Sequence, residues 1–368
     1  MKKRSMKSLA VLLAIVCLMS IALTACGNTS ENPGNDTQHP ESQTPTTQTP
    51  TTQTPTTQPP TTQPPADETT EWPFELFASD LPDGYKKVNE QTGTVVEELY
   101  TTYAYDNDGV AGEAMEARMY VYLPYDYDES QQYDVLYLMH GGGEAEGYWF
   151  GMDKYAEGGE KYNKAQHYCT NMLDNMFANG DCANVIIVTP TTNNNGTDKF
   201  PYELNNDIIP YIESKYSTYA AGDVSTENLI ATRDHRAFAG FSMGSITTRN
   251  VWQKSLEYIA YLGNYSGFDP NEEGSVDNIL ALMNEGGAYA DYELKYWFNA
   301  TGDLDTAERD HLDHYARILE GGSSFLQEGE DYMNGDNCIM VDKPGFGHAY
   351  NGWVVDLYNS LLVFFKVP

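Results

Sequence analysis

The sequence predicts an α/β fold with a mostly parallel central sheet and helices on both faces. Two observations predict it. Short apolar runs alternate with amphipathic segments of helical length through most of the chain, which is typical of parallel strands joined by helical crossovers. In addition, the pentapeptide Gly240-Phe241-Ser242-Met243-Gly244 follows one apolar run and precedes a helix-compatible segment. Ser242 is therefore expected in a tight turn between a strand and a helix.

The N-terminus is expected to direct the protein out of the cytoplasm. Basic residues in the first seven positions precede an apolar run at residues 9–23, and Thr24 and Ala25 precede Cys26. This arrangement resembles the lipobox of bacterial lipoproteins, which implies that residues 1–25 are a signal peptide and that Cys26 is lipidated. An ordinary signal peptide or an uncleaved anchor is the alternative. Each interpretation places the protein at the extracellular face of the cell membrane or in the medium.

Residues 26–70 are predicted to be a disordered linker. They contain few apolar side chains, and a five-residue Thr-Pro-Thr-Thr-Gln unit recurs between residues 44 and 63. Such a segment cannot bury a core, and its prolines favour an extended conformation. We therefore expect the folded domain at residues 71–368, with the linker as a spacer between it and the anchor.

The formal net charge of the chain is −33. A field of this sign repels nucleic acid and anionic lipid surfaces, so neither is an expected partner, and the membrane is expected to be contacted through the N-terminal lipid alone. Beyond the signal, Cys169, Cys182 and Cys338 allow at most one disulfide, and their spacing matches no metal site. Cys169 lies on the apolar stripe of a predicted helix and is expected to be buried.

The individual elements follow from hydrophobic periodicity. Strands are predicted at residues 94–105, 118–123, 135–140, 185–188, 236–239, 296–300 and 338–341. Helices are predicted at residues 168–177, 204–216, 245–260, 308–319 and 352–365. Pro210 is expected to kink the second of these or to mark a new start. Asp106-Asn107-Asp108-Gly109 is interpreted as a hairpin turn rather than a calcium loop. Residues 268–292 are acidic and glycine-rich with weak periodicity, and we interpret them as a cap beside the functional site to which Ser242 belongs.

A serine nucleophile needs a base within hydrogen-bonding distance and a carboxylate that orients the base. His348 is the candidate base, because it follows the last predicted strand in a glycine-flanked loop just before the final helix. Asp303 and Asp305 both follow the preceding predicted strand, and either one could orient the histidine or cap a helix. The order serine, aspartate, histidine is that of α/β-hydrolases rather than of chymotrypsin or subtilisin.

The glycine run His140-Gly141-Gly142-Gly143 ends another predicted strand. Because glycines carry no side chains, backbone N–H groups near Gly142 can approach a developing oxyanion, and the N–H group of Met243 can meet it from the other side. We therefore expect Gly142 and Met243 to form the oxyanion hole. This chemistry requires no metal ion and no cofactor.

At these residues the chain resembles the esterase-D-like branch of α/β-hydrolases, and in particular the feruloyl esterase domains of carbohydrate esterase family one. The resemblance covers roughly residues 93–365. Its motifs lie at residues 120–124, 136–143, 188–191, 209–216, 235–236, 240–244 and 344–348. It implies an α/β-hydrolase fold and the catalytic set Ser242, Asp305 and His348, since the family carboxylate usually lies three residues past a glycine, here Gly302.

The same resemblance implies hydrolysis of an ester that links ferulic or a related hydroxycinnamic acid to arabinoxylan, by way of an acyl-enzyme. Tyr148, Trp149, Tyr350 and Trp353 flank the catalytic loops. They are candidate substrate-binding residues, because aromatic rings can stack on a phenolic acyl group or on sugar rings. The expected partner is a feruloylated or acetylated xylan-type polysaccharide, and the expected oligomeric state is a monomer.

Other functions are compatible with the same sequence. An acetyl-xylan or other small-acyl esterase fits the same turn, because acyl specificity is decided by the shape of the pocket. A siderophore-type esterase or an acyltransferase is compatible with the fold as well. An interpretation from another class is a surface carbohydrate-binding protein on an inactive hydrolase scaffold, against which the complete set of serine, aspartate and histidine argues.

Overall fold

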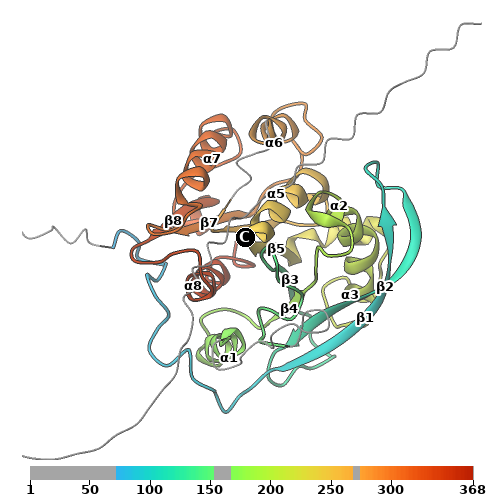
Figure 1. Ribbon diagram of the computed structural model, residues 1–368, viewed down its shortest axis with the longest axis horizontal. Helices are drawn as coiled ribbons and strands as arrows, with labels where there is room; N and C mark the ends of the chain where they lie inside the picture. The colour runs from blue at the N-terminus through green and yellow to red at the C-terminus, as the bar shows by residue number, and fades with distance from the viewer. Residues whose placement is uncertain (1–71, 153–166, 268–273, 368) are drawn as a thin grey trace, which may run out of the picture. The chain divides into compact units, whose positions relative to one another are not determined.

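The structure of the protein is a computed structural model that describes residues 72–152, 167–267 and 274–367 (Figure 1). The expected signal peptide, Cys26 and the whole of the expected linker lie outside the described residues. Contacts divide the chain into one unit, Met1–Glu68, and a second, Thr69–Pro368. Every described helix and strand belongs to the second unit.

An eight-stranded mixed sheet forms the centre of this unit, in the order β1-β2-β4-β3-β5-β6-β7-β8. β1 pairs antiparallel with β2 and β2 antiparallel with β4, whereas all neighbours from β4 to β8 are parallel. The mostly parallel sheet confirms the predicted fold class. The strands are β1 Thr94–Tyr105, β2 Ala111–Leu123, β3 Asp134–Met139, β4 Val185–Thr189, β5 Arg236–Phe241, β6 Tyr261–Tyr265, β7 Tyr296–Gly302 and β8 Cys338–Lys343.

Helices cover both faces of the sheet (Figure 1). One core cluster joins α1 and α8 to one face, and a second joins α2, α3, α5, α6 and α7 to the other. The helical segments are α1 Cys169–Asn179, α2 Gly196–Glu203, η1 Leu204–Ile208, α3 Ile209–Lys215, α4 Thr226–Ala231, η2 Arg233–His235, α5 Met243–Ser255, α6 Ser275–Met283, α7 Glu308–Gly321, η3 Tyr332–Asn334 and α8 Tyr350–Leu361.

Strand β3 contributes buried side chains to the core on both faces of the sheet. Leu136 and Leu138 belong to the first core cluster, whereas Val135, Tyr137 and Met139 belong to the second. Successive side chains of a strand point to opposite faces, so a strand covered on both faces needs a continuous apolar run. All residues of β3 are buried accordingly.

The predicted helix at residues 245–260 is wrong at its end. α5 ends at Ser255, and the strand β6, which the sequence analysis missed, follows it. Gly263 and Asn264 weaken the strand signal of β6, yet all its residues are buried between β5 and β7. Asn264 is stable there because its amide oxygen accepts a hydrogen bond from the indole of Trp297 at 2.9 Å.

The predicted helix at residues 204–216 is interrupted. It begins with a π-helical turn, η1, and continues as α3, in which Pro210 lies in the first turn. Proline has no N–H group, and its ring clashes with the carbonyl four residues earlier in a continuous α-helix. The wider π turn removes that conflict and lets the chain continue in the same direction.

The segment interpreted as a cap contains a core helix. α6 buries Val276, Ile279 and Met283 in the second core cluster. The part of the segment from residue 274 onward therefore includes a helix of the layer that covers the sheet, and the cap interpretation is wrong for that helix. Residues 268–273 lie outside the described residues.

The hairpin and cysteine predictions agree with the structure. Asp106 Oδ1 accepts the amide N–H groups of Asp108 and Val110, both at 2.9 Å, in the turn between β1 and β2. Cys169 is buried as expected. Cys182 and Cys338 are buried free thiols as well, so none of the three cysteines beyond the signal is in a disulfide.

Candidate active site

Ser242 lies in the sharp turn between β5 and α5, at the carboxyl edge of the sheet. Its φ of 54° and ψ of −118° are values that residues with a side chain rarely adopt. A Cβ atom on Gly240 would lie 2.7 Å from the backbone of Gly244, and one on Gly244 would lie 2.7 Å from the carbonyl oxygen of His140. Both glycines of the motif are therefore required by close backbone approach.

The structure brings the three predicted catalytic residues together. His348 Nε2 lies 2.9 Å from Ser242 Oγ, and His348 Nδ1 lies 2.9 Å from Asp305 Oδ1. The carboxylate accepts a hydrogen bond from Nδ1–H, which leaves Nε2 without a proton and able to accept that of the serine. The serine, aspartate and histidine follow β5, β7 and β8, whose parallel carboxyl ends meet at one edge.

The structure also separates the two candidate aspartates. Asp303 Oδ1 accepts the amide N–H of Gly345 at 2.7 Å, so this side chain braces the loop that carries the histidine. Leu304 lies between the two aspartates, and its amide donates to the carbonyl of Phe346 at 3.0 Å. A Cβ atom on Gly302 would lie 2.2 Å from that same carbonyl oxygen. The two loops pack too closely for any residue but glycine at that position.

Asp305 is held in its ionised form. Burial raises the pKa of this carboxyl, but hydrogen bonds from His348 and from the amide of Ala307 outweigh burial, and the pKa is lowered from its ordinary value. The Ala307 amide donates to Oδ1 at 2.8 Å. An ionised carboxylate here keeps the proton of the imidazole on Nδ1 and stabilises an imidazolium.

The predicted oxyanion-hole residues face one another. A Cβ atom on Gly142 would lie 3.8 Å from the Cβ atom of Met243. Because α5 begins at Met243, the N–H group of this residue has no carbonyl partner inside the helix and points out of its N-terminus. The same N-terminus places the positive end of the helix dipole at the position of a developing oxyanion.

His140 fixes the loop that carries Gly142. Burial lowers the pKa of His140, so its imidazole is neutral. Its Nδ1 donates to the carbonyl oxygen of Gly141 at 2.8 Å, and its Nε2 accepts the hydroxyl of Thr191 at 2.9 Å. The glycine run therefore has a defined conformation.

His311, a buried residue that the sequence analysis did not single out, also supports the site. His311 Nδ1 accepts the amide N–H of Gly267 at 3.2 Å, and its Nε2 donates to Asn299 at 3.2 Å. Burial lowers the pKa of His311 to about 3, which keeps it neutral. The carbonyl of Gly267 in turn accepts the hydroxyl of Ser245, so the loop after β6 is tied to α5. His311 lies on a predicted helix, and the sequence pattern of that helix does not distinguish a buried histidine from an exposed one.

The four predicted substrate-binding aromatics do not share one environment. Trp149 has no exposed surface, and its indole N–H donates to the carbonyl of Met139 at 3.1 Å. Trp353 is 5% exposed, stacks on Phe241 with ring centroids 3.7 Å apart, and lies edge-on to His348 at 5.2 Å. In this structure Trp149 therefore offers a ligand no face to stack on, whereas the expected role of Trp353 stays a prediction.

Tyr148 and Tyr350 are only partly buried. Their ring centroids lie 5.6 Å apart, and the hydroxyl of Tyr350 donates to the carbonyl of Trp149 at 2.9 Å. That hydroxyl also accepts the amide N–H of Cys169 at 3.0 Å. Tyr350 thus ties the end of the glycine loop to α1, and Tyr148 retains surface that a ligand can reach.

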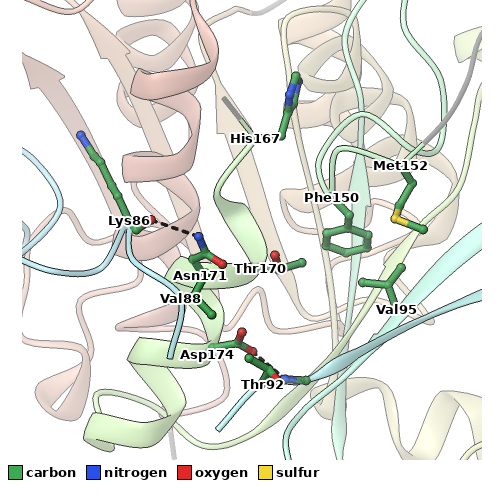
Figure 2. A pocket seen from close by; sticks show the side chains of 11 residues that line it. Lys86, Val88, Thr92, Val95, Phe150, Met152, His167, Thr170, Asn171 and Asp174 are labelled. Carbon is green, nitrogen blue, oxygen red and sulfur yellow. Dashed lines mark hydrogen bonds between the residues drawn. The ribbon is translucent and has the colours of Figure 1, made fainter. Parts of the chain in front are cut away.

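A cavity of about 520 Å³ is lined by residues of the segment before β1 and of α1, among them Val88, Asn171 and Asp174 (Figure 2). His167, which lines it, has its ring 5.0 Å from Tyr148 and 4.6 Å from Tyr350. Asp174, also in the lining, already accepts the amide of Gly93 at 2.8 Å. The described lining includes none of the three catalytic candidates.

Comparisons with known proteins agree with this geometry. Residues 113–248 match the model of the esterase family, described as "Putative esterase". Endo-1,4-beta-xylanase Y of Acetivibrio thermocellus is 36% identical over 289 residues, which is 77% of this chain and 24% of the relative. An endo-1,4-beta-xylanase/feruloyl esterase of Xylanibacter ruminicola is 29% identical over 162 residues, 40% of this chain and 19% of the relative. The chain thus spans a quarter or less of the curated relatives it matches.

A solved structure covers the domain more fully. The feruloyl esterase module from Clostridium thermocellum, a serine-to-alanine mutant complexed with sinapinate, superposes with a TM-score of 0.67 at 28% identity, covering 80% of this chain and 96% of that one. Residues 113–248 therefore belong to the esterase family, and the domain around them has the fold of a feruloyl esterase module. The ferulic acid esterase from the fungus Anaeromyces mucronatus shares the fold of this esterase, with a TM-score of 0.57 at 21% identity over 79% of this chain and 98% of that one.

Two further observations concern what the described part of the esterase contains. No group of three or more histidine, cysteine, aspartate or glutamate side chains is arranged there to hold a metal ion. Within the same residues, no helix combines the length and the apolar character that a membrane span needs.

Proposed function

We propose that this esterase hydrolyses carboxylic esters of plant cell-wall polysaccharide and releases ferulic or a related hydroxycinnamic acid from arabinoxylan. The observation that carries the reaction class is the hydrogen-bonded chain from Asp305 through His348 to Ser242, with each contact at 2.9 Å. The acyl class is supported by the likeness to the feruloyl esterase module of Clostridium thermocellum, which this chain covers almost completely.

The acylation step uses all three side chains. His348 Nε2 takes the proton of Ser242 Oγ while the oxygen attacks the ester carbonyl carbon. The carbonyl oxygen becomes an oxyanion, which the N–H groups of Gly142 and Met243 stabilise. The intermediate collapses as the bond to the sugar oxygen breaks, and His348 gives its proton to the leaving sugar hydroxyl.

Deacylation repeats the sequence with water. His348 takes a proton from a water molecule, and the resulting hydroxide adds to the carbonyl of the acyl-enzyme. Collapse of the second intermediate returns the proton to Ser242 Oγ and releases the free hydroxycinnamic acid. Asp305 stays ionised throughout and stabilises the imidazolium that forms in each half-reaction.

A substrate panel tests the proposal. The wild-type protein and Ser242→Ala are compared on methyl ferulate, feruloylated arabinoxylan fragments and acetylated xylan. We expect the feruloyl esters to be cleaved by the wild type only. Cleavage of acetylated xylan alone would replace the acyl assignment by the small-acyl alternative. Binding of polysaccharide without cleavage of any ester would support the inactive scaffold instead.

We also propose that the esterase is anchored by lipid on Cys26, after removal of residues 1–25, and acts as a monomer at the extracellular face of a bacterial membrane. The basic, apolar and small-residue segments before Cys26 support this anchoring. Metabolic labelling with a fatty acid tests it, since Cys26→Ala should lose both the label and membrane retention. Light scattering of the purified domain tests the monomer.

A further inference from the structure

The carboxyl group of Glu144 turns back onto the glycine run that precedes it. Its Oε2 accepts the amide N–H of Gly141 at 3.0 Å. Gly143, which lies inside this turn, has a φ of 80°, a value that favours glycine. The side chain therefore closes a tight loop around Gly142 and Gly143.

Gly141 is consequently held at both of its backbone polar groups. Glu144 accepts its N–H, and His140 Nδ1 donates to its carbonyl oxygen at 2.8 Å. That carbonyl belongs to the same planar peptide unit as the N–H of Gly142, which points in the opposite direction. Fixing Gly141 at both ends therefore fixes the direction of the Gly142 N–H.

The other bonds of this loop act further along the chain. Asn193 donates to the backbone carbonyl of Glu144 at 3.4 Å, and Thr189 donates to the carbonyl of Glu146 at 2.7 Å. The side chain of Glu146 accepts the guanidinium of Arg118 at 2.6 Å. Of these hydrogen bonds among the described residues, the one accepted by the Glu144 carboxyl ends on the glycine run itself.

The groups around this carboxyl agree with a placement inside the site. Burial raises the pKa of Glu144 to about 7, against the opposing effects of the Gly141 amide, a hydrogen bond with Tyr148 and the charge of His348. The carboxyl is thus close enough to His348 for their charges to interact. Its oxygen accepts the Gly141 N–H in either protonation state, because a neutral carboxyl keeps its carbonyl oxygen.

We propose that Glu144 is a positioning residue of the esterase reaction, whose carboxyl holds the Gly141 amide and thereby aims the Gly142 N–H at the oxyanion. This inference rests on the proposed serine esterase function. It does not depend on the acyl group, because every ester passes through the same oxyanion.

The test compares Glu144→Gln with Glu144→Ala on p-nitrophenyl acetate, an activated ester that reports on the serine whatever its natural substrate is. The glutamine amide oxygen can accept the same N–H, whereas alanine cannot. We expect kcat of Glu144→Ala to fall by about 10-fold to 100-fold with KM within about twofold, since loss of a whole oxyanion donor costs about 10²-fold to 10³-fold. Glu144→Gln should keep kcat within about threefold of the wild type.

A pH profile and hydrogen exchange separate positioning from simple loss of structure. Because the Glu144 carboxyl accepts the Gly141 N–H in either protonation state, kcat of Glu144→Gln should follow the wild-type pH profile within about threefold between about pH 5 and about pH 9. Amide exchange over residues 140–147 should speed up in Glu144→Ala and stay slow in Glu144→Gln, a readout that does not require activity. Glu113→Ala, at an exposed position of β2, is the matched control.

Two results would overturn the inference. The first is an unchanged kcat and unchanged exchange in Glu144→Ala. The second is an equal loss of kcat in both variants, which would assign the effect to the charge rather than to the bond. If the wild type cleaves p-nitrophenyl acetate but no feruloyl ester, the acyl assignment fails and the inference about Glu144 stands.

Discussion

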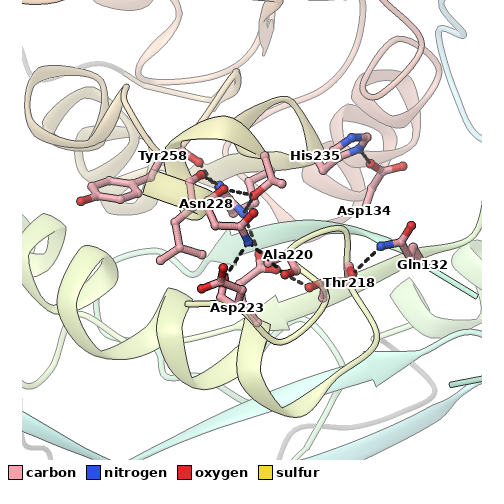
Figure 3. Close-up of polar contacts among 12 residues, drawn as sticks. Gln132, Asp134, Thr218, Ala220, Asp223, Asn228, His235 and Tyr258 are labelled. Carbon is pink, nitrogen blue, oxygen red and sulfur yellow. Dashed lines mark hydrogen bonds and ion pairs between the residues drawn. The ribbon is translucent and has the colours of Figure 1, made fainter. Parts of the chain in front are cut away.

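Two histidine–aspartate pairs lie at opposite edges of the same sheet, and only one is placed beside a serine. At the carboxyl edge, His348 Nδ1 lies 2.9 Å from Asp305. At the amino edge, His235 Nδ1 lies 2.7 Å from Asp134, which begins β3 (Figure 3). The two contacts are chemically equivalent. Their difference in role must therefore come from the surroundings.

Those surroundings differ in two respects. The ring of Tyr219 stacks flat on His235 with centroids 3.4 Å apart, whereas His348 reaches the hydroxyl of Ser242 through Nε2. Burial raises the pKa of Asp134, and the bond to His235 offsets this effect only in part. For Asp305 the hydrogen bonds outweigh burial and the pKa is lowered. A histidine–aspartate pair thus becomes catalytic through its place next to the strand-to-helix turn, not through its own geometry.

The largest expected effect separates the two histidines. His348→Ala should lower kcat by about 10⁴-fold or more, because the serine loses its base. His235→Ala should leave kcat within about threefold, because this ring lies at the opposite edge of the sheet. Rates on p-nitrophenyl acetate measure both, with circular dichroism to show that each variant is folded. A comparable loss in the two folded variants would contradict the comparison.

The two aspartates after β7 extend the comparison of the two histidine–aspartate pairs. Asp305→Asn should lower kcat by about 10³-fold to 10⁴-fold, because an amide cannot hold the required tautomer of His348. Asp303→Asn is the matched control, and its amide oxygen can still accept the Gly345 N–H, so we expect a loss below about tenfold. If Asp303→Asn were the more damaging change, the assignment of the carboxylate would be reversed.

Two acids at the carboxyl edge should affect stability in opposite directions with pH. The pKa of Glu144 is raised to about 7, so its stabilising contribution is present below its unfolded-state pKa and is lost as the pH rises through about 7. The contribution of Asp305, with its lowered pKa, is instead lost as the pH falls. Relative to Glu144→Gln, the wild type should lose about 2 kcal/mol of unfolding free energy between about pH 5 and about pH 8. Urea titrations at both pH values measure it, and a constant difference between the two proteins would refute it.

The smallest effect concerns an aromatic residue beside the site. Trp149→Phe should lower the free energy of unfolding by about 1 to 3 kcal/mol, because it opens space in the core and removes the bond to the Met139 carbonyl. KM should stay within about twofold, since Trp149 has no exposed face. Thermal unfolding and steady-state kinetics test both statements. A large rise in KM with unchanged stability would restore the substrate-binding interpretation.

The sequence by itself determined the fold class, most of the strands and the residues from which the site is built. Strand β1 was predicted with both ends correct, and the turn at Ser242 was placed between its strand and helix. These features are local, because side-chain periodicity and the requirement of a tight turn for glycine depend on residues that are neighbours in the sequence. The spacing of Ser242, the aspartates and His348 then followed from the order of the strands.

Only the tertiary structure decided features that depend on distant neighbours. The residues alone left Asp303 and Asp305 open, and the family resemblance implied Asp305. The contact of Asp305 with His348 itself forms because two loops from β7 and β8 pack against each other at Gly302. β6 is a strand because β5 and β7 enclose it, although its own residues signal strand weakly. The places of Trp149 in the core and of Glu144 at the glycine run likewise depend on residues outside their own local pattern. Burial and hydrogen-bond partners arise when separate segments meet, and no local pattern records which segments those are.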